Sequence, residues 1–125
     1  MLLYHYTNKK ALAAIVRSGL IKPSNPWTAA DATYGTGWYF TDLSPDDCDL
    51  DIAYFCWGNP HFARRVKCYV AFDIPVSLVK RCRKHVYMVK SWDRRIREVG
   101  RGEKGDCPQK PCSTCADGQQ YRFYL

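Results

Sequence analysis

Apolar residues occur along the chain in short runs separated by glycine, proline and polar residues. Continuous or alternating apolar runs predict strands over residues 2–6, 37–43, 66–74, 85–89 and 120–125. Apolar positions at helical spacing predict helices over residues 8–17 and 51–56, with one further helical turn over 76–80. The pattern is that of an α+β domain with few helices on a mixed or antiparallel sheet.

The predicted helix ends follow from local chemistry. Asn8 is placed to cap the first helix, and Gly19 is placed to end it. The second helix is expected to start between Pro45 and Asp49, with acids in its first turn that suit the helix dipole, and to stop near residues 58–60. Residues 23–34 and 93–118 lack a periodic pattern, so they are predicted to be loops, the second a long irregular excursion rich in charge, Gly, Cys and Pro.

The length sets the scale of the protein. A chain of 125 residues supports one domain, predicted here over residues 1–125. No apolar run is long enough to span a bilayer, and the first residues lack a basic segment followed by a long apolar stretch. These features predict no membrane association and a cytoplasmic or nuclear location, with a secreted effector left open.

Charge is distributed unevenly along the chain. The net charge is +7, from 19 Lys plus Arg against 12 Asp plus Glu. Acids concentrate in residues 42–51, and bases concentrate in residues 64–101. Two interpretations remain open: solvated surfaces that keep the protein soluble, or a basic surface that attracts a nucleic acid or an anionic cofactor.

The seven cysteines cannot all pair with one another, because their number is odd. Four lie in or beside apolar segments and are predicted to be reduced core residues: Cys48, Cys56, Cys68 and Cys82. Three more lie within nine residues: Cys107, Cys112 and Cys115. Free thiols, a disulfide, or a zinc ion with Cys82 or a histidine as fourth ligand all remain open for this group, with zinc not favoured.

Two segments carry the candidate chemistry. Residues 2–7 read Leu-Leu-Tyr-His-Tyr-Thr and bring a histidine onto a short apolar strand. Residues 35–43 read Gly-Thr-Gly-Trp-Tyr-Phe-Thr-Asp-Leu and form a later strand. The pair resembles the NAD-binding half of the diphtheria-toxin and poly-ADP-ribose-polymerase type of ADP-ribosyltransferases. It most resembles the small group with a His-Tyr-Asp signature, the HYD1-type ADP-ribosyltransferase domains.

The resemblance implies a site for NAD as substrate. It implies that His5 holds the adenosine ribose, that the Tyr6 backbone meets the nicotinamide amide, and that the Thr7 hydroxyl contacts the ribose region. In the second motif, it implies that the Tyr39 ring stacks on nicotinamide beside Phe40, while Gly37 lets the backbone approach the ligand. Tyr54, on the helix that follows, is the candidate for the second stacking ring, with core packing as the alternative.

The third catalytic position departs from the family pattern. The family usually has Glu at the start of a late strand, and Gln120 takes that place here. An amide orients a hydroxyl but cannot accept its proton, so the resemblance implies single-unit transfer or NAD hydrolysis, not polymer growth. Asp117 and Asp42 are the alternative acids.

The resemblance thus implies a mono-ADP-ribosyltransferase or NAD glycohydrolase, toxin-like, that releases nicotinamide. The acceptor, whether protein or nucleic acid, and the oligomeric state stay open. Two other functions remain alternatives on the same fold. One is a non-catalytic module that binds a nucleotide, a nucleic acid or a protein, and the other is an RNA 2′-phosphotransferase that uses the Arg64–Arg65 or Arg94–Arg95 pair.

Overall fold

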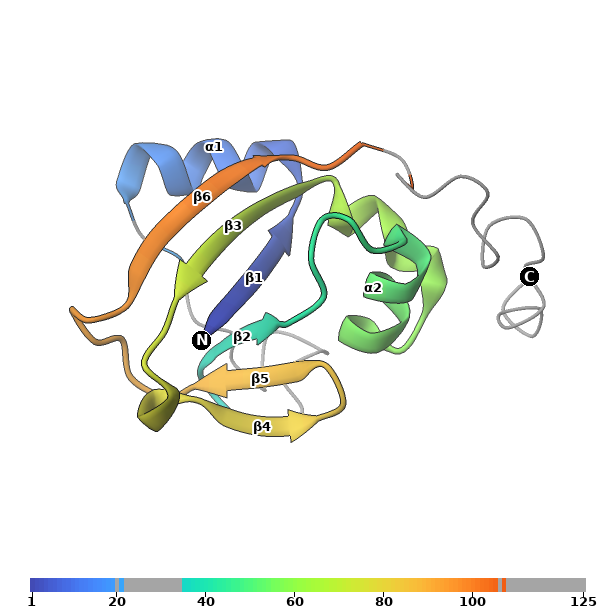
Figure 1. Ribbon diagram of the computed structural model, residues 1–125. Helices are drawn as coiled ribbons and strands as arrows, with labels where there is room; N and C mark the ends of the chain where they lie inside the picture. The colour runs from blue at the N-terminus through green and yellow to red at the C-terminus, as the bar shows by residue number, and fades with distance from the viewer. Residues whose placement is uncertain (20, 22–34, 106, 108–125) are drawn as a thin grey trace.

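The computed structural model describes residues 1–19, 21, 35–105 and 107. Six antiparallel strands form one sheet in the order β4-β5-β2-β1-β3-β6, which confirms the α+β class and makes the sheet antiparallel (Figure 1). The strands are β1 (Leu2–Thr7), β2 (Trp38–Thr41), β3 (Cys68–Asp73), β4 (Lys80–Arg83), β5 (Val86–Val89) and β6 (Arg97–Glu103). The helices are α1 (Lys9–Ser18), α2 (Asp49–Trp57) and two short 3₁₀ helices, η1 (Pro60–Val66) and η2 (Val76–Leu78).

The sheet consists of two well-paired halves with a weak seam between them. β1 pairs with β3 along its whole length, from Leu2–Asp73 to Thr7–Cys68, and β2 pairs with β5 along its whole length. Between β1 and β2, in contrast, the register has one pair, Tyr4 with Thr41. Figure 1 shows the consequence: the β4-β5-β2 group and the β1-β3-β6 group lie at an angle to one another.

Each face of the sheet carries its own core, because successive residues of a strand point to opposite faces. On one face Leu3, Phe40 and Val70 are buried together, and Leu12 of α1 packs against them. On the other face Tyr6 is buried with residues of α2 and η1. None of the described helices is long and apolar enough to cross a membrane.

The helix ends largely follow the sequence. The Asn8 side chain accepts a hydrogen bond from the Ala11 amide, and Gly19 ends α1 with a φ of 71°. α2 begins at Asp49, at the C-terminal limit of the range expected for its start, and ends at Gly58 with a φ of 74°. Both glycines occupy left-handed conformations that other residues adopt only at a cost.

The prediction that residues 93–118 form an irregular excursion is wrong for its first part, because β6 pairs there with β3. β4 was also not predicted as a strand. A helical turn was predicted over residues 76–80, and the observed turn, η2, ends at Leu78. Both strands lie at the edges of the sheet and are rich in charged residues, Lys and Arg in β4 and Arg and Glu in β6. Charged edge strands resist pairing with other chains and show little apolar alternation, which is the signal used to find strands.

Gly37 is required by the closeness of β5. A Cβ at this position would lie 2.8 Å from the Val89 carbonyl oxygen and 3.0 Å from the Met88 Cγ. We expect Gly37→Ala to lower the free energy of unfolding by about 1–3 kcal/mol, since backbone must move to admit the methyl group. Gly100→Ala is the matched control, because its Cβ would meet the Ala71 Cβ at an ordinary 3.9 Å. Denaturant unfolding measures both, and equal stability of the two variants would contradict this account.

Candidate functional site

A cleft opens where β1 and β2 diverge. Its described lining comes from four elements: Tyr4, His5 and Tyr6 of β1, Tyr39, Phe40 and Thr41 of β2, Cys56 and Trp57 of α2, and Arg83 and Val86 of the β4–β5 hairpin. The cleft therefore brings together four of the residues singled out from the sequence: His5, Tyr6, Tyr39 and Phe40. Most of the remaining lining is aromatic or apolar, as expected of a site for a planar ring.

His5 bridges the two halves of the sheet at this point. Its Nδ1 lies 3.3 Å from the Tyr39 carbonyl oxygen, and its ring meets the Phe40 ring edge to face at 6.3 Å. A carbonyl oxygen only accepts hydrogen bonds, so this contact requires the proton on Nδ1. In the neutral ring Nε2 is then the acceptor, which suits contact with a hydroxyl group.

Two tyrosine hydroxyls hold the backbone around the cleft. The Tyr39 hydroxyl donates to the Gly35 carbonyl at 2.5 Å, so its ring is fixed against the segment that leads into β2. The Tyr6 hydroxyl donates to the Leu43 carbonyl at 2.8 Å, and the side chain is 6 % exposed. Burial raises the pKa of Tyr6 far above its ordinary value, so this phenol remains a donor at all physiological pH values.

Three other sequence candidates lie outside this lining in the part of the chain that the structure describes. Thr7 lines a neighbouring groove with α1 and with His5, which borders both hollows, and Gly37 packs against β5. Tyr54 packs its ring edge to face on Phe55 at 5.3 Å. From α2 it is Cys56 and Trp57 that reach the cleft.

Arg83 is a cleft residue that the sequence did not single out. Its guanidinium donates to the carbonyl oxygens of Phe55 and Cys56, at 3.0 and 3.1 Å. These carbonyls lie in the last turn of α2, where a cation also interacts favourably with the helix dipole. Arg83 thus ties the β4–β5 hairpin to α2 and brings positive charge to the cleft. Nothing in the sequence separates it from the neighbouring Lys and Arg residues of β4.

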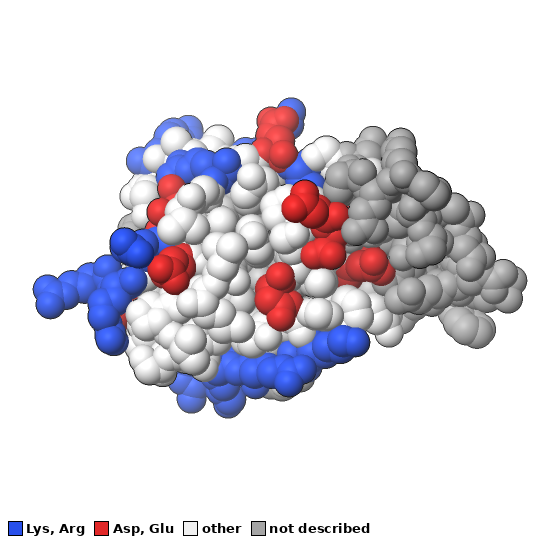
Figure 2. Space-filling model, in the orientation of Figure 1, with Lys and Arg blue, Asp and Glu red and all other residues white. Residues whose placement is uncertain are grey.

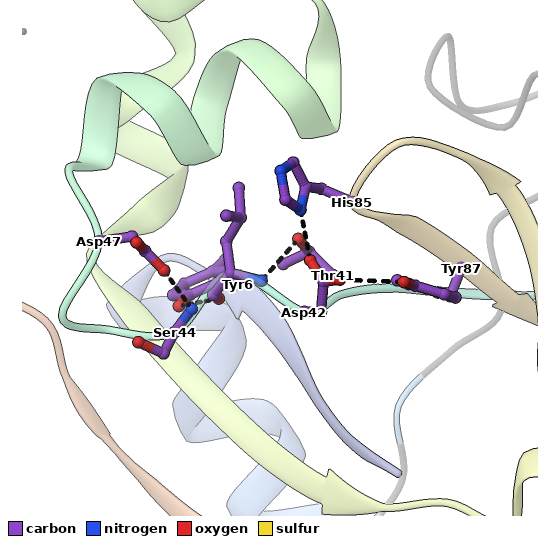
Figure 3. A network of polar contacts seen from close by, with 8 residues as sticks. Tyr6, Thr41, Asp42, Ser44, Asp47, His85 and Tyr87 are labelled. Carbon is purple, nitrogen blue, oxygen red and sulfur yellow. Dashed lines mark hydrogen bonds and ion pairs between the residues drawn. The ribbon is translucent and has the colours of Figure 1, made fainter.

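Asp42 belongs to a polar cluster beside the cleft, drawn in Figure 3. β2 ends at Thr41, and the Asp42 side chain turns towards the β4–β5 hairpin. Its Oδ1 lies 2.6 Å from His85 Nδ1, and its Oδ2 accepts a hydrogen bond from the Tyr87 hydroxyl at 2.9 Å. This hydrogen bond from Tyr87 to Asp42 raises the pKa of the Tyr87 phenol. Both carboxylate oxygens of Asp42 are therefore engaged.

The surface around the cleft is mixed in charge. Figure 2 shows Lys and Arg side chains along the lower edge of this view, where Figure 1 places β4, and acidic side chains across the face above it. On β4, Lys80 and Arg81 are exposed. The uneven charge of the sequence thus appears as a basic edge and an acidic face.

No disulfide joins two of the cysteines in the described residues. Cys48 and Cys68 are buried as predicted, and Cys56 and Cys82 are half-buried. Cys107 is buried against Cys48. Cys112, Cys115, Asp117 and Gln120 lie outside the described residues. Within those residues, no group of three or more His, Cys, Asp or Glu is arranged to hold a metal ion.

The cleft lined by His5 and Tyr39 brings together the two motifs that resemble those of ADP-ribosyltransferases. The family described as HYD1 signature containing ADP-ribosyltransferase matches residues 3–95, and the chain belongs to this family. No curated protein and no solved structure matches the chain. The match covers β1 to β5 and stops before β6, so Gln120 lies beyond it.

The Tyr6 hydroxyl has a structural role that stability measurements can detect. We expect Tyr6→Phe to lower the free energy of unfolding by about 1 kcal/mol, because the buried hydrogen bond to Leu43 is lost. Tyr4 provides the matched control, since its ring stacks on Tyr6 at 6.2 Å but its hydroxyl makes no hydrogen bond within the described residues. Thermal unfolding should therefore separate Tyr6→Phe from Tyr4→Phe; a larger loss in Tyr4→Phe would refute the assignment.

Proposed function

We propose that this protein cleaves the nicotinamide–ribose bond of NAD and transfers a single ADP-ribose unit to an acceptor or to water. The observation that carries the proposal is the cleft between β1 and β2, which combines aromatic faces with the His5 ring in a chain of the ADP-ribosyltransferase family. The reaction fits the cleft's chemistry. The nicotinamide ring of NAD is cationic, aromatic faces attract such a ring, and it departs as a neutral molecule when the bond breaks.

Tyr39 is the proposed stacking partner for nicotinamide. Its hydroxyl is held by Gly35, so little side-chain entropy is lost when a ligand stacks on the ring. Tyr54 and Trp57, both on α2, are the candidates for the opposite face. Tyr54 follows from the family resemblance, and Trp57 is favoured by its place in the cleft lining.

His5 is the proposed ribose ligand. With the proton held on Nδ1 by the Tyr39 carbonyl, Nε2 accepts a hydrogen bond from a ribose hydroxyl. The Tyr6 backbone, next in the chain, is the proposed partner of the nicotinamide amide, and this role makes no use of the Tyr6 side chain. The resemblance also assigns two further residues to the NAD site: Thr7, whose hydroxyl would contact the ribose region, and Phe40, beside Tyr39.

The stacking proposal is tested by NAD binding. Loss of a stacked ring costs about 1 kcal/mol or more beyond the lost area, which is about fivefold in affinity. We expect Tyr39→Ala to weaken NAD binding in calorimetry by at least about this factor, while Tyr39→Phe keeps most of the affinity. Tyr54→Ala and Trp57→Ala identify the second ring, since the one that stacks should show a similar loss. Unchanged affinity in Tyr39→Ala would rule out the placement.

His5 is tested by kinetics. We expect His5→Ala to raise the KM for NAD in an assay of nicotinamide release, because a hydrogen bond to the bound ribose is lost. A chelator should leave the rate of the parent protein unchanged, since the proposed role of His5 involves no metal. A chelator-sensitive rate, or an unchanged KM in His5→Ala, would argue against a ribose contact.

The third catalytic position is tested by exchanging an amide side chain for a carboxylate, or the reverse, at each candidate residue. Gln120→Glu should raise nicotinamide release if this residue faces the ribose, because a carboxylate stabilises the charge that develops on the sugar. Asp117→Asn and Asp42→Asn test the two alternatives on the same footing. An unchanged Gln120→Glu rate with Asp117→Asn inactive would move the role to Asp117, whereas an inactive Asp42→Asn moves it to Asp42 only if variants of its partner His85 stay active. A parent that releases no nicotinamide from NAD would favour the binding module instead.

A further inference from the structure

His85 has no part in the function proposed so far, and its partner Asp42 enters that function as one alternative for the third catalytic position. We propose that His85, oriented by Asp42, is the general base that takes the proton from the nucleophile that attacks the ribose. The inference rests on the proposed cleavage of NAD and adds to it the group that activates the acceptor or water. The residue is a separate one from His5, which is proposed to bind the ribose.

The hydrogen bonds of the pair set the state of the imidazole. His85 Nδ1 lies 2.6 Å from Asp42 Oδ1, and a carboxylate accepts, so the proton belongs on Nδ1. In the neutral ring Nε2 is then the basic nitrogen. Tyr87 donates to Asp42 Oδ2 at 2.9 Å and so keeps the carboxylate from rotating away. A carboxylate in this place also stabilises the imidazolium that forms when Nε2 takes a proton.

The backbone and the packing fix where the ring points. His85 lies at the turn between β4 and β5 and has a positive φ of 64°. No other non-glycine residue in the described part of the chain has a positive φ. Such a conformation costs free energy for a residue of this type and persists where the surroundings determine it. The Phe55 ring meets the imidazole edge to face at 4.7 Å, from the side of α2. The ring is thus held between Asp42 and α2, as Figure 3 shows for the Asp42 side.

The pair adjoins the proposed NAD cleft. Thr41 precedes Asp42, and Arg83 and Val86 flank the His85 turn; all three line the cleft. The His85 side chain is 27 % exposed, so a solvent molecule or an acceptor can reach it. The histidine therefore lies at the border between the cleft and solvent, where an attacking nucleophile would enter.

The charged groups around His85 come from three sides. Asp42 contacts it from the end of β2, with Tyr87 of β5 bonded to the other oxygen of that carboxylate, and α2 contributes the uncharged Phe55 ring. From the hairpin, Lys84 lies over Phe55 at 5.6 Å, and Arg83 is bonded to α2 carbonyls. The negative charge of Asp42, directly beside the imidazole, offsets the positive charge of Lys84 and Arg83.

The step is balanced in protons and electrons. The nucleophile's oxygen forms a bond to C1′ of the ribose, while its proton passes to His85 Nε2. The bond from C1′ to nicotinamide breaks, and its electron pair neutralises the cationic ring. With water as nucleophile the products are ADP-ribose and nicotinamide, and the proton on His85 is released to solvent.

The test is nicotinamide release from NAD in water, measured as kcat and KM against pH. His85→Asn is the first variant, because asparagine tolerates the left-handed backbone of this turn. We expect kcat to fall by about 100-fold or more, with KM little changed, and we expect the parent to lose rate at low pH and the variant not to. His61→Asn is the matched control, because His61 is exposed on η1, and this variant should keep the parent rate. In His85→Gly, added imidazole should restore part of the lost rate.

The outcomes separate this inference from the function it rests on. An active parent whose rate and pH profile survive in His85→Asn would overturn the role of His85 and leave NAD cleavage standing. A rate lost in His85→Asn, but not restored by imidazole in His85→Gly and independent of pH in the parent, would also overturn it, since a base must titrate. A parent that releases no nicotinamide would overturn both proposals.

Discussion

The separation of β1 from β2 is the constraint on which the rest of this structure depends. Each strand is fully paired on its other side, β1 with β3 and β2 with β5. Neither strand therefore needs the other to hold its position. Their register has one pair, Tyr4 with Thr41, and beyond it His5 contacts the Tyr39 backbone. Polar backbone groups that leave a ladder need other partners, and side chains supply them here. The same divergence opens the cleft.

The elements around the cleft are held by side-chain contacts to backbone carbonyls. Arg83 ties the β4–β5 hairpin to the end of α2, and Tyr6 ties β1 to the segment after β2. Because these contacts come from different parts of the chain, the cleft depends on the whole fold and not on one loop. The family match over residues 3–95 covers the segments that supply the described lining. We expect a fragment of this region to need the β6 edge for stability, since β6 pairs with β3.

Local chemistry made much of the fold predictable. The cap residues Asn8 and Gly19 mark the ends of α1, and the apolar runs mark β1, β2, β3 and β5. β4 and β6 were not predicted, because charged edge strands lack apolar alternation. For the site, His5, Tyr6, Tyr39 and Phe40 were brought together as the two motifs suggested.

Other parts of the site depend on contacts that no local pattern reveals. After its first turn α2 has no distinct polar face, so its sequence does not tell which residues reach the cleft; Cys56 and Trp57 line it, and Tyr54 does not. The Asp42–His85 pair joins residues 43 positions apart through a hairpin turn with a positive φ. An isolated histidine in a basic segment gives no sign of such a partner.

The proposed site for NAD is the cleft between β1 and β2. Amide chemical shifts recorded by NMR during titration with NAD locate the binding surface, because each residue reports separately. We expect the largest changes at residues 4–6 and 39–41, with smaller ones at Trp57 and Val86. Changes confined to the groove around Trp38 and Trp92, or no changes at saturating NAD, would contradict this placement.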